Sequence, residues 1–297
     1  MADNFKERFS QAVKETETVV YSYLPEETGH QKTIFEAMNY SVKAGGKRLR
    51  PLLMREVYRL FGGNGPEIEP FMAAMEMIHT SSLIHDDLPC MDNDEYRRGK
   101  LTTWKAYGYD MAVLAGDALM IYAFETASKA FSMSADPAKV GRAIGILAEK
   151  TGIYGMIGGQ TVDVELTGKA VPREKLDFIY RLKTGALLEA SMMIGAVLAG
   201  ATVEEIKEVE TMASEVGLAF QIQDDILDVV GDEATLGKPI GSDVRSDKTT
   251  FVALKGLADC RILVAELTDR AVEALAPFGS EAESLRGLAQ SLAGREK

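Results

Sequence analysis

Two clusters of aspartates lie in segments that are otherwise apolar and typical of helices. They occupy residues 86–92 (DDLPCMD) and residues 224–228 (DDILD). Burying carboxylates is costly unless something pairs with them, and neighbouring like charges repel each other. A fold that accepts both clusters has to supply cations. We therefore expect the fold to bring the clusters face to face around metal ions and a substrate that needs those ions.

The second cluster has the simpler geometry. Gln221, Asp224, Asp225 and Asp228 stand at positions i, i+3, i+4 and i+7, which form one continuous face of a helix. A core helix normally gives such a face to Leu and Val. A solvated acidic face is the alternative interpretation, but the apolar neighbours and the existence of a second cluster favour a metal site.

The first cluster is interrupted by a proline. Asp86 and Asp87 lie near the end of a predicted helix, and Pro89 removes an amide donor and forces a turn. We expect this turn to bring Asp92 back beside Asp86. Carboxylate oxygens suit a hard cation such as Mg²⁺, which proteins commonly share with substrate phosphates.

Other metal sites fit the sequence less well. A Cys/His arrangement for zinc is not apparent. An EF-hand loop starting at Asp92 fails, because Arg97 occupies the position that requires glycine. A metal-storage or calcium-binding module would explain the acidic residues, but it leaves the basic segments described below without a role.

The composition favours an all-α fold. Helix-forming residues are abundant, and proline stands mostly where a helix should begin or end. The pattern predicts helices over residues 71–88, 173–190 and 209–230, and a loop over residues 236–250 that folds over a site. A length of 297 residues suggests about two domains. No compositional boundary supports a division, so we predict a single all-helical domain over residues 1–297.

Charge and cysteine content exclude several classes of protein. The net charge of −12 argues against nucleic-acid binding, which needs a basic surface. A small anionic substrate remains compatible with it, because local basic clusters reverse the sign at one site. Only Cys90 and Cys260 occur, so no disulfide framework is expected. We find neither an apolar run of about 18 residues nor a signal core at the N-terminus, and expect a cytoplasmic protein without a membrane segment.

Basic residues accompany the acidic clusters. A Gly-Gly-Lys-Arg segment covers residues 45–48, a pair of arginines follows the first cluster, and further lysines occur at Lys183, Lys238 and Lys248. Ion pairing alone would explain any one of these elements. Their combination predicts a site that receives two polyanions, one through metal ions and one through direct contacts with Lys and Arg.

Together these motifs resemble the trans-prenyl diphosphate synthases, of the bacterial short-chain farnesyl/geranylgeranyl type. The segments that carry the resemblance span nearly the whole chain in the family's order. They are residues 45–51 (GGKRLRP), His79, 82–94 (SLIHDDLPCMDND), 97–100 (RRGK), 116–119 (GDAL), 159–160 (GQ), 183–185 (KTG), 220–228 (FQIQDDILD) and 247–249 (DKT).

The resemblance implies an all-α isoprenoid-synthase bundle around a deep central cavity, normally as a homodimer. It also implies several Mg²⁺ ions, which Mn²⁺ can replace. Their ligands would be Asp86, Asp87, Asp92, Asp224, Asp225 and Asp228. The allylic diphosphate would contact Arg97, Lys183 and Lys238, with Thr184, Gln221 and Lys248 beside the allylic substrate. The diphosphate of isopentenyl diphosphate would contact Gly46, Lys47, Arg50, His79 and Arg98.

The implied reaction condenses isopentenyl diphosphate with dimethylallyl, geranyl or farnesyl diphosphate to give farnesyl or geranylgeranyl diphosphate. The catalytic residues would be Asp86, Asp87, Asp92, Arg97, Lys183, Asp224 and Lys238. In this family, residues just before the first aspartate pair help to form the floor of the product tunnel. Here those residues are Ser81 and Ser82, with Met77 and Ile78 about one turn further down.

Two alternatives share part of this pattern. A class I terpene cyclase would have the fold and the first aspartate motif, but it would not need Lys47, Arg50 and Arg98 for a second diphosphate. Consumption of isopentenyl diphosphate separates the two activities. A non-catalytic subunit of a heteromeric synthase would tend to lose one aspartate motif, whereas both motifs are intact here.

Overall fold

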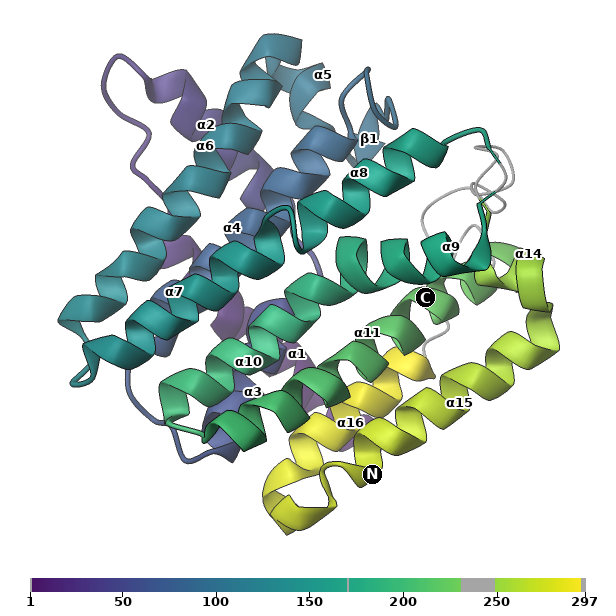
Figure 1. The fold of residues 1–297 in the computed structure, drawn as a ribbon. Helices are drawn as coiled ribbons and strands as arrows, with labels where there is room; N and C mark the ends of the chain where they lie inside the picture. Colours follow the sequence, from purple (N-terminus) through teal and green to yellow (C-terminus); the bar gives the residue numbers. More distant parts are fainter. Residues whose placement is uncertain (1, 170, 231–248, 295–297) are drawn as a thin grey trace. The chain divides into compact units, whose positions relative to one another are not determined.

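The computed structural model describes residues 2–169, 171–230 and 249–294, with side chains from residue 7 onward. These residues are almost entirely helical, and the predicted all-α fold is confirmed (Figure 1). Lys238, Lys248 and most of the predicted loop over residues 236–250 lie outside the described residues.

Contacts divide the chain into two compact units, each made of two separate stretches. Unit 1 comprises Met1–Arg55 and Asn64–Ile144, and unit 2 comprises Glu56–Gly63 and Gly145–Lys297. Helices α3 (Leu49–Leu60) and α7 (Pro137–Thr151) each contribute residues to both units. That residues 1–297 form a single domain stays a prediction.

Helix α4 (Ile68–Asp86) is the centre of unit 1. Its buried residues lie on all sides, so it is hydrophobic all round, as expected of a core helix. It packs along α6 (Tyr109–Ser128), α1 (Ala2–Ser22) and α2 (Lys32–Val42). Two short helical segments, α5 (Thr103–Tyr107) and η1 (Lys129–Ser132), adjoin α6.

The ends of α4 follow its prolines. The sequence predicted a start at residue 71, but the helix begins at Ile68 and takes Pro70 into its first turn. Proline is tolerated there, because the first amides of a helix have no partner within it. The helix ends at Asp86, before Pro89, so the predicted stop is confirmed to within two residues.

A small hairpin follows α4. Strands β1 (Tyr96–Arg97) and β2 (Lys100–Leu101) pair antiparallel, with Arg97 opposite Lys100. The two connecting residues, Arg98 and Gly99, have φ values of 54° and 75°. Positive φ at both positions is typical of a type I′ turn, which matches the twist of the paired strands. This hairpin was not predicted from the sequence.

A nearly continuous helical rod runs through unit 2. It consists of α9 (Arg173–Ile179), a π-helical segment η2 (Tyr180–Gly185) and the almost fully buried α10 (Ala186–Ala199). The first helix begins directly after Pro172, as predicted, but α10 ends at Ala199, nine residues beyond the predicted end at residue 190. Gly200 follows with a φ of 97°, which suits the glycine that commonly ends a helix. Single π-helical turns occur frequently at functional sites.

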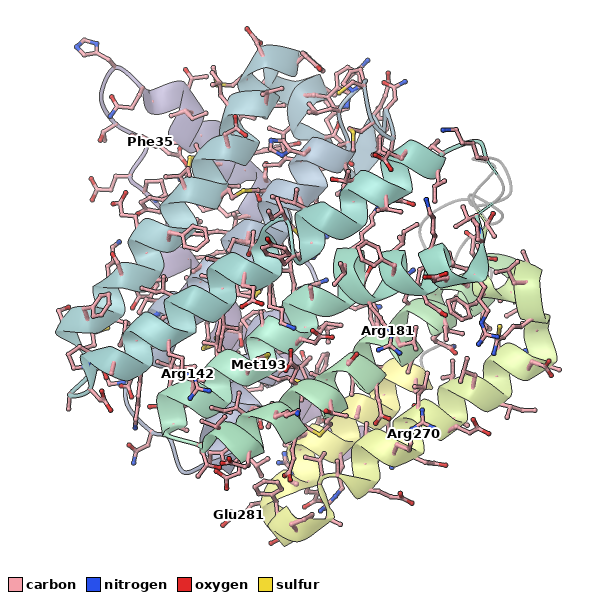
Figure 2. All side chains as sticks on the ribbon, viewed as in Figure 1. Phe35, Arg142, Arg181, Met193, Arg270 and Glu281 are labelled. Carbon is pink, nitrogen blue, oxygen red and sulfur yellow. The ribbon has the colours of Figure 1, made fainter. Side chains whose placement is uncertain are left out.

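Helix α11 (Val203–Val230) lies between α10 and α15 (Leu257–Glu273) (Figure 1). Arg181 of the π-helical segment and Arg270 of α15, both labelled in Figure 2, donate hydrogen bonds to Ser214 and Glu215 of α11. The remaining elements of unit 2 are α8 (Met156–Leu166), α14 (Phe251–Lys255), η3 (Ala276–Ala282) and α16 (Glu283–Ala293).

Two helical stretches among the described residues, Tyr109–Ser132 and Arg173–Ala199, are long and apolar enough to cross a membrane, judged by length and composition alone. The most apolar window of the second stretch is 78% buried, as expected of a core helix. The corresponding window of the first stretch is 39% buried, so α6 exposes apolar surface. That the chain has no membrane segment stays a prediction.

Candidate functional site

The turn after α4 folds the first acidic cluster back on itself. The backbone amide of Asp92 donates a hydrogen bond to the carbonyl of Asp86 over 2.9 Å. The expected return of Asp92 to Asp86 is therefore confirmed at the level of the backbone. The side chain of Asp86 is half-buried, and that of Asp92 is exposed.

Asp87 is held by an arginine of the hairpin. Only 3% of Asp87 is exposed. Arg97 donates from Nε over 2.8 and 3.0 Å to its two carboxylate oxygens, and Arg97 Nη2 lies 2.6 Å from Oδ1. Burial raises the pKa of the Asp87 carboxyl above its ordinary value, and the hydrogen bonds from Arg97 offset only part of this rise. The ion pair thus ties β1 to the end of α4.

The neighbouring histidine, His85, packs against α6. A Cβ at Gly116 would lie 2.1 Å from the Nε2 atom of His85, so only glycine lets the ring take this position. The same nitrogen lies 3.3 Å from the carbonyl oxygen of Val113 and 3.6 Å from Asp117 Oδ1. These contacts give His85 a structural role beside Asp86.

Three basic side chains of unit 1 lie close together. Arg98 donates a hydrogen bond to the carbonyl of Gly45. A Cβ at Gly46, where φ is 141°, would lie 2.8 Å from the guanidinium carbon of Arg98, so this approach requires glycine. Arg50 Nη1 lies 3.4 Å from Nε2 of His79, and the buried Nε of Arg50 has no hydrogen-bond partner among the described residues.

The electrostatics of this cluster suit an anion. Burial lowers the pKa of Arg50, the charge of Glu76 opposes this and the charge of Arg98 adds to it, which together bring the pKa to about 10. Burial and the charge of Arg50 hold the pKa of His79 well below its ordinary value. A diphosphate would relieve the repulsion among these groups and would accept their hydrogen bonds. The structure thus brings together Arg50, His79 and Arg98, and the exposed Lys47 lies in the loop that precedes α3.

In unit 2, the π-helical segment presents Lys183 and Thr184. Lys183 Nζ lies 2.6 Å from Oδ2 of Asp163 on α8, and the Thr184 hydroxyl donates to the Gln221 side chain over 2.8 Å. Gly159 makes this packing possible, because a Cβ there would lie 2.3 Å from the Lys183 amide nitrogen. Asp163 was not predicted from the sequence, although a carboxylate among the apolar residues of α8 indicates a buried partner.

The acidic stripe of α11 is not a solvated face, because Asp225 and Asp228 are both 3% exposed. The Tyr180 hydroxyl lies 2.7 and 2.9 Å from the two carboxylate oxygens of Asp225, and the Phe251 amide donates to the same carboxylate over 2.9 Å. Asp225 therefore joins α11 to the π-helical segment and to the start of α14.

A cavity of about 140 Å³ opens among these groups of unit 2. Its polar lining includes Lys183, Thr184, Gln221, Asp225 and Asp163, and the side chains of Leu166, Leu176 and Ile179 supply apolar walls. Lys183, Thr184 and Gln221, which were predicted to lie at the allylic substrate, thus line one cavity.

The predicted tunnel-floor residues all belong to α4. Met77, Ile78 and Ser81 are fully buried, whereas Ser82 is half-buried. The Ser81 hydroxyl donates to the Ile78 carbonyl over 2.7 Å, so its polar group is satisfied within the helix. Their position at a tunnel floor stays a prediction.

The donor set of both clusters suits a hard cation by its chemistry, because it offers carboxylate oxygens. Within the described ranges, however, no three His, Cys, Asp or Glu side chains are arranged to hold an ion. Asp87 instead binds Arg97, and Asp225 binds Tyr180 and the Phe251 amide. The two clusters also fall in different units. Their face-to-face arrangement and their role as metal ligands therefore stay predictions.

Comparison with known proteins gives consistent matches. Residues 31–275 match the family model described as polyprenyl synthetase. The chain is 46% identical over 265 residues to a chloroplastic geranylgeranyl pyrophosphate synthase of Capsicum annuum, covering 89% of this chain and 72% of that protein. It is 44% identical over 262 residues to the farnesyl diphosphate synthase of Geobacillus stearothermophilus, covering 88% of each.

Solved structures agree with these matches. An FPP/GFPP synthase from Zymomonas mobilis superposes with a TM-score of 0.87 at 36% identity, covering 99% of this chain and 100% of that chain. A geranyltransferase from Helicobacter pylori, solved as a complex with magnesium and isoprenyl diphosphate, superposes with a TM-score of 0.83 at 32% identity. That superposition covers 96% of this chain and 95% of that chain.

The contacts of Asp225 predict a stabilising role for Tyr180. Tyr180→Phe removes a hydrogen bond to a buried carboxylate, so we expect the free energy of unfolding to fall by about 1.5–3 kcal/mol. Urea unfolding at neutral pH measures this. The matched control is Tyr154→Phe, at a tyrosine that is 75% exposed, and should leave stability unchanged. Equal stability of the two variants would contradict the assigned contact.

The lowered pKa of His79 predicts a pH effect on stability. Between about pH 6.5 and the lower folded pKa, the unfolded state takes up a proton that the folded state does not. The contribution of His79 to stability is therefore complete above about pH 6.5 and is lost as the pH falls. Urea unfolding at several pH values should show a smaller acid-induced loss for His79→Gln than for the wild type; an equal loss would contradict the shift.

Proposed function

Because the chain belongs to the polyprenyl synthetase family and is a short-chain trans-prenyltransferase, we propose that it condenses isopentenyl diphosphate with dimethylallyl and geranyl diphosphate. Farnesyl diphosphate is a further candidate primer. The observation that carries this proposal is that basic side chains gather in both units. Arg50, His79 and Arg98 cluster in unit 1, whereas Lys183 and Thr184 line the cavity of unit 2. A transferase with two diphosphate substrates needs both groups.

The allylic diphosphate is assigned to the acidic clusters and their basic neighbours. In this proposal Asp86, Asp87, Asp92, Asp224, Asp225 and Asp228 bind several Mg²⁺ ions, for which Mn²⁺ can substitute. When bound, these ions neutralise the charge that develops on the leaving diphosphate. Arg97, Lys183 and Lys238 contact the same diphosphate, and Thr184, Gln221 and Lys248 lie beside the allylic substrate.

The second diphosphate is assigned to Gly46, Lys47, Arg50, His79 and Arg98. Neutral His79 donates one ring N–H, whereas Arg50 and Arg98 supply charged donors. The buried Nε of Arg50, which has no partner among the described residues, supports this assignment. Gly46 allows the approach of Arg98, since a side chain there would collide with it.

The reaction then needs no protein nucleophile. The allylic C–O bond breaks, the diphosphate leaves with the electron pair, and an allylic cation remains. The double bond of isopentenyl diphosphate attacks this cation, which forms the new C–C bond. Loss of a proton restores a double bond, and the departing diphosphate is the proposed base. The protein orients the two substrates and excludes water from the cation.

The product is proposed to be farnesyl diphosphate, geranylgeranyl diphosphate or both. Ser81 is small, which favours a deeper tunnel floor, and Met77 and Ile78 lie about one helical turn further down. Ser82 lies on the same segment. The sequence relatives include both farnesyl and geranylgeranyl synthases. A terpene cyclase and a non-catalytic subunit are not favoured.

The wild-type protein, incubated with isopentenyl diphosphate, each allylic primer and Mg²⁺, should form fifteen- or twenty-carbon products. Mass spectrometry sizes them, and chelation of the metal should stop the reaction. Ser81→Phe fills the predicted floor and should shorten the product. Ser81→Ala keeps the residue small and serves as the control.

Three results would contradict these assignments. Failure to consume isopentenyl diphosphate would contradict the proposed transferase reaction. Products of thirty carbons or more would refute the short-chain assignment. An unchanged product length in a folded Ser81→Phe variant would show that Ser81 does not lie at the floor.

We also propose a homodimer in the cytoplasm. Leu114 and Ile121 of α6 stand seven positions apart, hence on one helix face, and are 54% and 70% exposed. The most apolar window of the stretch that contains α6 is only 39% buried, and contiguous apolar surface is typical of interaction sites. The cytoplasmic location rests on the sequence argument and is tested by cell fractionation.

Sedimentation velocity should show a dimer for the wild type. Ile121→Glu places a charge on the proposed interface and should shift the protein toward the monomer. The control is Ile262→Glu on α15, which changes an isoleucine that is 58% exposed. A wild-type monomer, or an Ile121→Glu variant that remains fully dimeric, would contradict this interface.

A further inference from the structure

Arg48 differs from the basic residues on either side of it, Lys47 in the same loop and Arg50 in the first turn of α3. It stands between Lys47 and Arg50, both assigned to the diphosphate of isopentenyl diphosphate, yet its side chain is fully buried. Its φ is 50°, in the left-handed region that non-glycine residues rarely adopt. A buried arginine with this backbone conformation requires compensating contacts, since both features are unfavourable by themselves.

Those contacts come from three helices of unit 1. Arg48 Nη1 lies 2.6 Å from Oε1 of Glu76 on α4, and Nε donates to Glu17 of α1 over 3.2 Å. Nη2 donates to the Tyr21 hydroxyl over 3.1 Å and to the carbonyl of Val42, at the end of α2, over 2.7 Å. The guanidinium thus holds the loop against α1, α2 and α4 at once.

Arg48 cannot contact a substrate directly, because its side chain is buried and each guanidinium nitrogen already donates to the protein. Any effect on substrate binding must act through its neighbours. Two features of the sequence link Arg48 to the residues that bind substrate in the proposed function. Arg50 follows Arg48 by two residues on the same segment, and His79 follows Glu76 by one helical turn. The Arg48–Glu76 pair therefore joins the two segments that meet at the Arg50–His79 contact.

Glu76 also acts on this cluster electrostatically. It is 2% exposed. Burial lowers the pKa of Arg50 and of Arg98, and the charge of Glu76 opposes this effect at both residues. One buried carboxylate thus partly offsets the repulsion between guanidinium groups while leaving an excess of positive charge. This excess suits a diphosphate, whereas an exposed partner carboxylate would compete with it.

We propose that Arg48 and Glu76 are positioning residues for the isopentenyl diphosphate pocket. By folding inward onto Glu76, Arg48 holds the positive-φ turn, keeps Lys47 at the surface and sets Arg50 against His79. This inference rests on the proposed function, in which Lys47, Arg50 and their neighbours bind the diphosphate of isopentenyl diphosphate. The simpler alternative is that the pair only stabilises unit 1.

Kinetics with two substrates separate these roles. The test variant is Arg48→Met with Glu76→Leu, because replacing both members of a buried ion pair by apolar residues is often neutral for stability, whereas removing one is not. We expect a folded protein with a lower thermal midpoint than the wild type, because Glu17, the Tyr21 hydroxyl and the Val42 carbonyl still lose their donor. The KM for isopentenyl diphosphate should rise about tenfold, since small misplacements of binding groups are costly. The KM for geranyl diphosphate should stay within about twofold.

Two single variants complete the test. Glu76→Gln keeps the side-chain volume and one acceptor for Arg48 but removes the charge, so it should raise the same KM even if the double variant does not fold. The matched control is Arg55→Met. Arg55 is also a largely buried arginine that pairs with α1, through Glu15 over 3.4 Å, but it lies outside the loop. It should leave both KM values unchanged.

The outcomes are distinct. A selective rise in the KM for isopentenyl diphosphate supports the proposal. An unchanged KM for isopentenyl diphosphate in folded variants overturns it. An equal rise in the KM values for both substrates also overturns it, because that result indicates structural damage alone. A wild-type protein that does not consume isopentenyl diphosphate contradicts the proposed function, and that result is separate from any difference between the variants.

Discussion

Each unit of this helical protein depends on how its buried carboxylates are neutralised. Burying an unpaired carboxylate costs several kcal/mol, so the core must supply a cation or several donors. Asp87 binds Arg97, and Glu76 binds Arg48. Asp225 receives a tyrosine hydroxyl and a backbone amide instead. Each interaction joins two or more segments: the hairpin to α4, the Gly-Gly-Lys-Arg loop to three helices, and the π-helical segment to α11 and α14.

This distribution of partners leaves a net positive charge around Arg50 in unit 1. Arg50 has an unpartnered buried Nε among the described residues and a lowered pKa, and it lies beside a histidine kept neutral by its surroundings. Such a group suits a polyanion better than a protein carboxylate. The buried acids Asp87, Glu76 and Asp225 are matched by donors within the protein, which leaves a net positive charge around Arg50. The cavity of unit 2 has a different character, because apolar walls adjoin a lysine and four threonines.

Much of this was predictable. The 3.6-residue period and the placement of proline indicated the helices that start after Pro172 and end before Pro89, since proline lacks the amide that a helix interior needs. The return of Asp92 to Asp86 followed from the same proline. Other features were not local. The contact of Asp163 with Lys183 and the inward turn of Arg48 each depend on a partner distant in sequence. The type I′ hairpin is local, but its turn has arginine rather than asparagine or aspartate before Gly99, so the usual turn signal is missing. Glu76 is a single carboxylate within the apolar run of α4, and that position indicates a buried partner such as Arg48.

The sequence by itself determined the all-α class, the family and the residue types of the chemistry, because periodicity, proline positions and motif spacing are written along the chain. Tertiary structure decided which of the charged residues pair with one another. Arg97, Arg48 and Arg50 look alike in the sequence, yet one binds Asp87, one is buried on Glu76 and one faces His79. The physical reason is that burial and charge pairing arise only when segments far apart in the chain pack together, which no local pattern encodes.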